Sequence, residues 1–172
     1  GVSEEYEYCW DNTHKPYLLS VVDNAPLGTA PAIDLTDEKT AQEWILSSPK
    51  AFCNTKDAAV LGQVLNNYDQ ETQDFYRWTV DFTQSELAEL IRRKSGLDFG
   101  EIIDLQPLER GKSGRITRLK IVGTKLTRII GKELEIRRTL SESHLYSSAF
   151  VIERSEVVNG VPQHFRLIGE GW

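Results

Sequence analysis

The residues best suited to chemistry in this sequence are the charged and glycine-rich ones near the middle of the chain. Gly111-Lys112-Ser113 has the ending of a phosphate-binding loop. Such a loop also needs a glycine five residues earlier, an apolar strand before it and a helix after it. Gln106 occupies the glycine position and an alternating strand pattern follows, so a cationic hairpin tip explains the stretch better than a nucleotide site. Its basic residues, which either pair with carboxylates of a ligand or face the solvent, are Arg110, Lys112 and Arg115.

Cysteine and histidine residues are too few and too scattered to form a metal site. A structural zinc site takes four ligands at short spacings such as C-x-x-C. Cys9, Cys53, His14, His144 and His164 lack such spacings, and no order of serine, histidine and aspartate suggests a hydrolase triad. We therefore predict no metal and no cofactor. The two cysteines permit at most one internal disulfide; otherwise they are buried thiols or pair with a cysteine outside this chain.

The composition is that of an ordinary globular protein with one domain. The chain has 172 residues, enough to bury a sizeable core, of which 40% are hydrophobic and 27% charged. No stretch approaches the roughly 20 apolar residues that cross a membrane. The net charge of −6 argues against nucleic acid as the main partner, although lysine and arginine are dense between residues 110 and 138.

Hydrophobic periodicity and turn residues predict the elements that must position these groups. Glycines 111 and 114 allow a tight reversal between two β-rich runs, Asn159-Gly160 allows another, and Thr83 with Glu86 forms a capping box that opens a helix. The predicted strands are residues 4–10, 17–22, 75–82, 101–109, 115–122, 124–130, 148–158 and 164–168. Four helices are predicted. One begins at Thr36 and one after Thr83, and the other two cover residues 57–65 and 132–140.

Helices and strands are mixed in this order without regular βαβ alternation, and most strands come in hairpins. This pattern predicts an α+β fold. We expect a largely antiparallel sheet built from hairpins, with two to four helices packed on it.

Several sequence segments follow one another in a specific order. GVSEEYEYCW at the start has the pattern G-x-[ST]-E-x-x-E-x-x-W, and PYLLSVV follows it at residues 16–22. LERGKSGRITRLKIVGTK comes later, then IGKELEIRRTL and SSAFVIE, and GEGW ends the chain. In this order the segments resemble the stage II sporulation protein D family (SpoIID/LytB, also called amidase enhancer proteins). The likeness covers most of the chain and is weakest between residues 23 and 68.

The resemblance implies an exported cell-envelope protein, periplasmic or extracellular, that acts on peptidoglycan glycan strands. Sporulation protein D proteins are lytic transglycosylases, in which one carboxylic acid protonates the glycosidic oxygen, and LytB-type relatives enhance a cell-wall amidase. The family's catalytic glutamate lies upstream of the segment that residues 1–10 match, and GEGW matches only the start of a longer G-x-G-W-G-H-G-x-G segment. We therefore expect residues 1–172 to be a single-domain fragment, truncated at both ends, without a catalytic residue and inactive alone. The alternative is a non-catalytic module that binds peptidoglycan or enhances an amidase.

Residues that match the family's motifs are the candidates for substrate contact. Glu4 and Glu7 match the family's glutamates, and Trp10 beside them could stack on a sugar ring; an edge-strand glutamate is more often solvated, however, and an early tryptophan more often packs. The remaining candidates are Arg115, Ser147, Ser148 and Trp172, with Gly169 and Gly171 beside them. Paired serines at a strand start are also common turn residues. If the chain is exported, as the family implies, an oxidising compartment permits a Cys9–Cys53 disulfide, and the other two states of the cysteines stay open.

Overall fold

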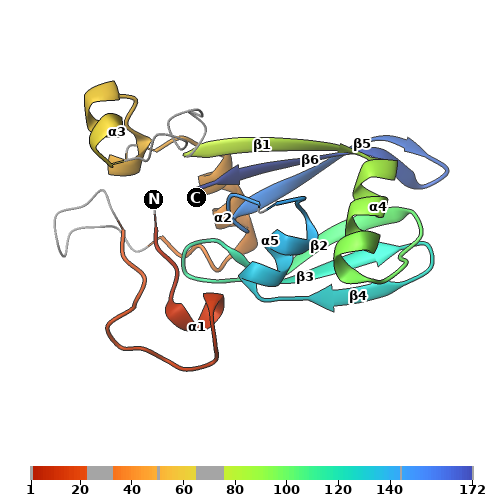
Figure 1. Ribbon diagram of the computed structural model, residues 1–172, viewed down its shortest axis with the longest axis horizontal. Coiled ribbons are helices and arrows are strands. Elements are labelled where there is room, and N and C mark those ends of the chain that lie inside the picture. The colour runs from red at the N-terminus through yellow and green to blue at the C-terminus, as the bar shows by residue number, and fades with distance from the viewer. Residues whose placement is uncertain (1, 23–32, 50, 65–75, 144, 172) are drawn as a thin grey trace.

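The computed structural model describes residues 2–22, 33–49, 51–64, 76–143 and 145–171 (Figure 1). The strands in these ranges form two three-stranded sheets, in which every pairing is antiparallel. The first sheet has the order β1-β6-β5, formed by Arg77–Thr83, Val161–Glu170 and Phe150–Val158. The second has the order β2-β3-β4, formed by Ile102–Arg110, Ile116–Gly123 and Thr127–Ile130. The predicted α+β class is confirmed.

The helices follow the capping signals in the sequence closely. In α4 (Gln84–Ser95) both halves of the predicted capping box are present, and Gly96 ends the helix with φ at 72°. The helix predicted from Thr36 is α2 (Glu38–Leu46), whose cap is Asp37, because the Asp37 carboxylate accepts from the Thr40 N–H. The other helices are α1 (Tyr6–Cys9), α3 (Ala58–Val64), α5 (Glu133–Thr139) and the 3₁₀ turn Phe52–Asn54. None of the described helices is long and apolar enough to cross a membrane.

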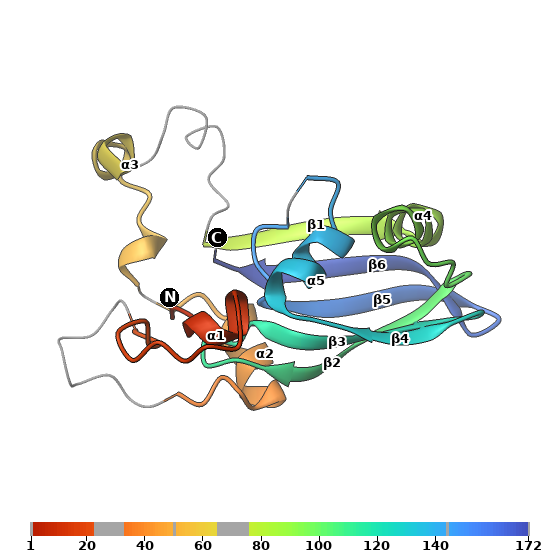
Figure 2. The ribbon, with the colours of Figure 1, turned by 60° about the horizontal axis from the view of Figure 1, so that its bottom comes forward.

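The main core lies between the two sheets and is closed by α4 and α5 (Figures 1 and 2). Its aromatic centre is Trp78 of β1, whose ring centroid lies 6.2 Å from that of Phe150 on β5. Gly169 on β6 faces this indole, and a Cβ at that position would lie 2.1 Å from a ring atom. Buried aliphatic side chains from both sheets complete the cluster, among them Ile102, Leu105, Ile116, Leu119, Ile121 and Leu167. The two sheets thus share one core.

Two predicted strands at the start of the chain are wrong. Residues 4–10 contain the helix α1, and residues 17–22 contain a turn followed by an isolated bridge between Val22 and Val2. The alternation of tyrosine and glutamate indicated a strand with one packed face, but no side chain between residues 2 and 22 is buried. Without a core to pack against, the alternating pattern does not select a strand.

Arg110, predicted at the exposed hairpin tip, is buried at 6% exposure and ties three elements together. Its Nε and Nη2 donate to the Glu38 carboxylate of α2 over 2.6 and 2.9 Å. Nη1 donates to the Gly114 carbonyl of the hairpin loop over 2.7 Å, and Nη2 also reaches the Phe150 carbonyl of β5 over 3.0 Å. Arg110 is buried and not exposed because a planar guanidinium satisfies several acceptors at once, so it can be buried where a lysine could not.

Replacing Arg110 with methionine should lower the free energy of unfolding by about 2–4 kcal/mol, because two backbone carbonyls lose buried donors and Glu38 loses its partner. Arg118→Met in the same hairpin is the matched control. The Arg118 guanidinium is 48% exposed, so its loss should change the free energy by less than about 1 kcal/mol. Urea unfolding measures both variants, and equal losses would contradict the anchoring role.

Candidate functional site

Glu4 belongs to the N-terminal segment, and its carboxylate reaches into the loop that joins β2 to β3. It accepts hydrogen bonds from the N–H groups of Lys112 (3.0 Å) and Ser113 (3.2 Å) and from the Ser113 hydroxyl (2.7 Å). Gly111 permits this approach, since a Cβ there would lie 2.2 Å from a Glu4 oxygen. Successive backbone N–H groups that converge in this way form an anion-binding concavity. We call residues 111–114 the hairpin cradle; an acidic residue of the chain itself fills it.

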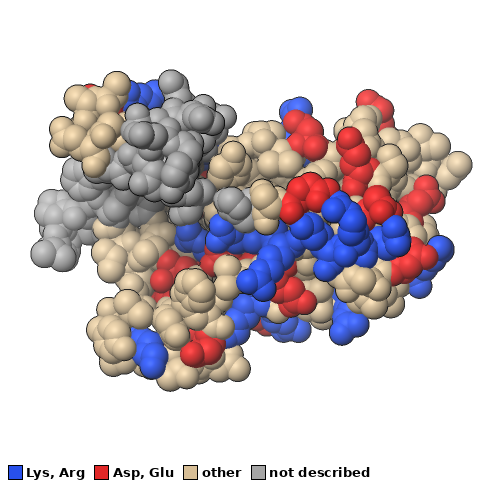
Figure 3. Space-filling view, in the orientation of Figure 1, with Lys and Arg blue, Asp and Glu red and all other residues tan. Residues whose placement is uncertain are grey.

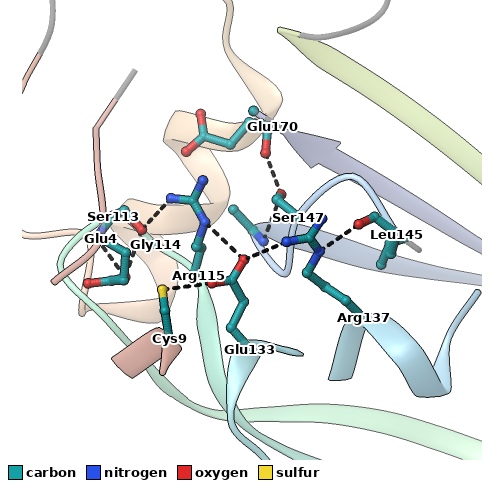
Figure 4. Close-up of polar contacts among 12 residues, drawn as sticks. Glu4, Cys9, Ser113, Gly114, Arg115, Glu133, Arg137, Leu145, Ser147 and Glu170 are labelled. Carbon is teal, nitrogen blue, oxygen red and sulfur yellow. Dashed lines mark hydrogen bonds and ion pairs between the residues drawn. The ribbon is translucent and has the colours of Figure 1, made fainter. Parts of the chain in front are cut away.

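A second carboxylate, that of Glu133 at the start of α5, is buried among three partners (Figure 4). One of its oxygens lies 3.4 Å from Arg115 Nε and 3.5 Å from Arg137 Nη1. Cys9 Sγ donates to the other oxygen over 2.8 Å. Burial, and then the hydrogen bond and charge of Glu133, raise the pKa of Cys9 to about 12. The protonated thiol therefore joins the N-terminal segment to α5.

Arg115 connects the two carboxylates. Its Nη1 donates to the Ser113 hydroxyl over 2.8 Å and to the Val2 carbonyl over 3.4 Å, while its Nε faces Glu133. Gly171 borders the same guanidinium, because a Cβ on that glycine would lie 3.7 Å from Arg115 Nη2. The Arg115 side chain is 16% exposed. This predicted substrate contact is thus engaged by groups of the chain itself, and it positions the start of the chain beside its last described residues.

Ser147 and Ser148 are buried at the entry to β5. Ser147 Oγ donates to the Glu170 carbonyl over 2.5 Å and accepts from the Ala149 N–H over 3.1 Å. The Ser148 carbonyl accepts from the Ile116 N–H over 3.0 Å, which links β3 to the other sheet. The Ser148 hydroxyl has no hydrogen-bond partner among the described residues. We call the cluster of Glu4, Cys9, Ser113, Arg115, Glu133, Arg137 and these two serines the junction (Figure 4). The double serine lies inside it, away from the solvent.

Glu170, at the end of β6, brings a third carboxylate to this junction. Its side chain is 7% exposed and lies 3.1 Å from Arg77 Nη1. Burial raises the pKa of Glu170, and the positive charge of Arg77 opposes that rise. Like Glu133, it is enclosed and paired, so neither carboxylate is open to a polymeric substrate.

The other predicted contacts lie outside this junction. Glu7 pairs with His14 across 3.0 Å, and its carbonyl accepts from Lys132 Nζ over 2.7 Å. Trp10 is 65% exposed and Tyr17 is 75% exposed, so both offer an aromatic face to a ligand. Trp172 lies outside the described residues. Among the predicted contacts that the structure describes, Trp10 is therefore the one left available for stacking.

Cys9 and Cys53 do not form the disulfide that export would permit. Cys9 lies on α1 against Glu133, whereas Cys53 lies exposed in the 3₁₀ turn Phe52–Asn54. A half-buried hydrogen bond to the Glu133 carboxylate holds the Cys9 thiol in place.

Sequence reasoning missed Cys9, Glu133 and Arg137 as members of the junction. The spacing of Glu133 and Arg137, four residues apart on a predicted helix, was the one available signal, because such residues share a helix face. Nothing local in the sequence shows that a cysteine 124 residues earlier meets the same carboxylate.

The junction is built to hold segments together more than to react. No group of three or more histidine, cysteine or acidic residues in the described ranges could hold a metal ion.

Two surface hollows lie away from the junction. One, of about 580 Å³, borders β5 and β6 near His164. The other, of about 530 Å³, lies between β1, α4 and the segment after α5. Neither hollow is lined by Glu133 or Glu170.

Comparison with known proteins gives one match. A family model described as a domain of unknown function (DUF8618) matches residues 4–172. No curated protein and no solved structure matches the chain. The matched range includes Glu4, Arg115, Glu133 and Glu170, so the junction belongs to the part of the chain that the family model covers.

Glu4→Ala should loosen the hairpin cradle. A hydrogen bond to a charged acceptor contributes about 1.5–3 kcal/mol, so amide exchange at Lys112 and Ser113 should accelerate roughly 10- to 150-fold. Glu5→Ala is the matched control, because the Glu5 carboxylate accepts no hydrogen bond from the described residues. Exchange followed by NMR measures both variants, and unchanged rates in Glu4→Ala would show that the loop does not depend on the carboxylate.

The two thiols should differ sharply in their reactivity toward a disulfide reagent in the folded protein. Only a thiolate attacks, so Cys9 should react far more slowly than exposed Cys53 at mildly alkaline pH, and both should react after denaturation. Glu133→Gln removes the negative charge beside Cys9 and should accelerate its reaction, although burial keeps its pKa above the ordinary value. Two equally fast thiols in the folded protein would contradict this environment.

Proposed function

We propose that this chain, which belongs to the family described as a domain of unknown function (DUF8618), is the scaffold of a cell-envelope protein that acts on peptidoglycan. One observation carries the proposal. The segments that resemble the SpoIID/LytB motifs are far apart in the sequence, yet Glu4, Arg115 and Glu133 lie in one bonded cluster, which includes the Val2 carbonyl and borders Gly171. Motifs that converge in space support a common role.

In this proposal the parent protein is a lytic transglycosylase whose catalytic glutamate lies upstream of this chain. Such an enzyme needs one carboxylic acid beside the glycosidic oxygen. The enclosed and paired state of Glu133 and Glu170 supports placing that acid elsewhere. The chain would then supply the frame: the junction fixes the N-terminal segment, and Trp10 at 65% exposure offers an indole face for a saccharide ring.

A second candidate is a non-catalytic module that enhances an amidase. The observation that favours it is the exposed apolar run at Tyr17, Leu18 and Leu19, with Val21 two residues on, which are 75%, 44%, 46% and 60% exposed. A cluster of exposed apolar side chains is typical of a protein interface. In that case the same segment would contact a protein and not a glycan.

Pull-down with purified sacculi tests the glycan role. Trp10→Ala should reduce retention of the chain at least about threefold, since stacking on an aromatic face contributes about 1 kcal/mol, whereas Trp10→Phe should retain most of it. Leu46→Ala, which removes another exposed apolar side chain, is the control and should bind like the unmodified chain. Failure of the unmodified chain to bind would contradict the proposal.

Turnover provides a separate test. The chain alone should release no anhydro-muropeptides from sacculi, because the proposal places the catalytic glutamate outside it and the buried Glu133 and Glu170 are enclosed. Mass spectrometry of the soluble fraction measures this directly. Anhydro-muropeptides above a heat-denatured control would show that the chain carries its own catalytic acid.

A further inference from the structure

Basic side chains gather in a band over α5 and the neighbouring end of α4 (Figure 3). The last turn of α4 carries Arg92, Arg93 and Lys94, and the last turn of α5 carries Arg137 and Arg138. Lys94 Nζ donates to the carbonyl of Glu142 just beyond α5, so the two helix ends are joined. We call these five side chains the α4–α5 basic band.

The band is only partly neutralised by its neighbours. Arg92 pairs with Glu89 and Arg93 with Glu142, while Arg137 shares the buried Glu133 with Arg115. Arg138 is exposed and has no ion-pair partner within the described residues. Positive charge is therefore left over on this face of a chain whose net charge is −6.

Helix stability alone does not account for the arrangement. Cations in the last turn interact favourably with the helix dipole, by about 0.3–1 kcal/mol each, which explains why each helix ends in basic residues. It does not explain why two helices from different parts of the chain bring their basic ends to one face. Glu89, Glu142 and Glu133 offset part of this charge, and the cations left over repel each other unless a further anion binds between them.

We propose that the α4–α5 basic band binds a linear acidic polymer with repeated oxyanion groups. Four of the five cations are arginines, whose guanidinium grips a phosphate or carboxylate with two parallel hydrogen bonds. Acidic side chains border the band in Figure 3, so the positive surface is a narrow stripe, and this shape suits a strand. The inference is independent of the function proposed above.

Two other acidic surfaces fit the band less well. A membrane surface is held partly by apolar side chains that enter the lipid, and neither α4 nor α5 carries an exposed large hydrophobic residue. Single-stranded nucleic acid is held by aromatic side chains on which bases stack. The exposed aromatic residues Tyr8, Trp10 and Tyr17 belong to the N-terminal segment and not to these helices.

Binding of inorganic polyphosphate and of polyglutamate, measured by titration calorimetry at several salt concentrations, tests the proposal. The double variant Arg92→Gln/Arg138→Gln should bind about tenfold more weakly, with a slope of log affinity against log salt smaller by about 1.5. Lys39→Gln/Arg118→Gln removes the same charge from outside the band and should stay within about twofold of the parent chain. If the double variant does not fold, as judged by circular dichroism, Arg138→Gln alone serves.

Three results would overturn the proposal: no binding of either polymer at low salt, equal losses in the band variant and the control, or tighter binding to vesicles of anionic phospholipid or to single-stranded DNA than to both polymers. Binding of one polymer only would support the proposal and identify the oxyanion. Because sacculus retention is tested through Trp10, a failure here is distinct from a failure of the peptidoglycan role.

Discussion

Two arginines on either side of one glycine-rich loop hold this structure together. Arg110 enters the interior and joins the loop to α2 and β5, while Arg115 joins the loop to α5 and to the start of the chain. Buried or half-buried charge has to be paired and hydrogen-bonded to be tolerated. The positions of α2, α5 and residues 2–22 therefore depend on the geometry of this hairpin.

This constraint divides the molecule into a firm part and a loosely held part. The two sheets share one apolar core with α4 and α5, whereas residues 2–22 have no buried side chain and contact the body through Glu4, Cys9 and backbone carbonyls. Polar contacts of this kind fix the orientation of a segment more than they add to the stability of the fold. They hold exposed Trp10 near the hairpin, which is where the peptidoglycan proposal needs an aromatic surface.

Signals from neighbouring residues predicted most of the fold. The features that they failed to predict depend on contacts between residues far apart in the sequence. The capping box at Thr83 and the turn at Asn159-Gly160 depend on neighbouring residues, and both are confirmed. The alternation of Tyr6 and Tyr8 with glutamates predicted a strand at the start of the chain. The structure of that segment depends instead on contacts with residues more than 100 positions away. The burial of Arg110 and the meeting of Cys9 with Glu133 have the same origin.

The proposed function requires that exposed Trp10, held in place by the converging motifs, contacts peptidoglycan. Titration of the ¹⁵N-labelled chain with a soluble muropeptide oligosaccharide, followed by NMR, tests it most directly. We expect the largest shifts at the indole N–H of Trp10 and at the amides of residues 112–115, with smaller ones at the start of α5. Shifts confined to the hollow near His164, or no shifts at millimolar ligand, would contradict the claim.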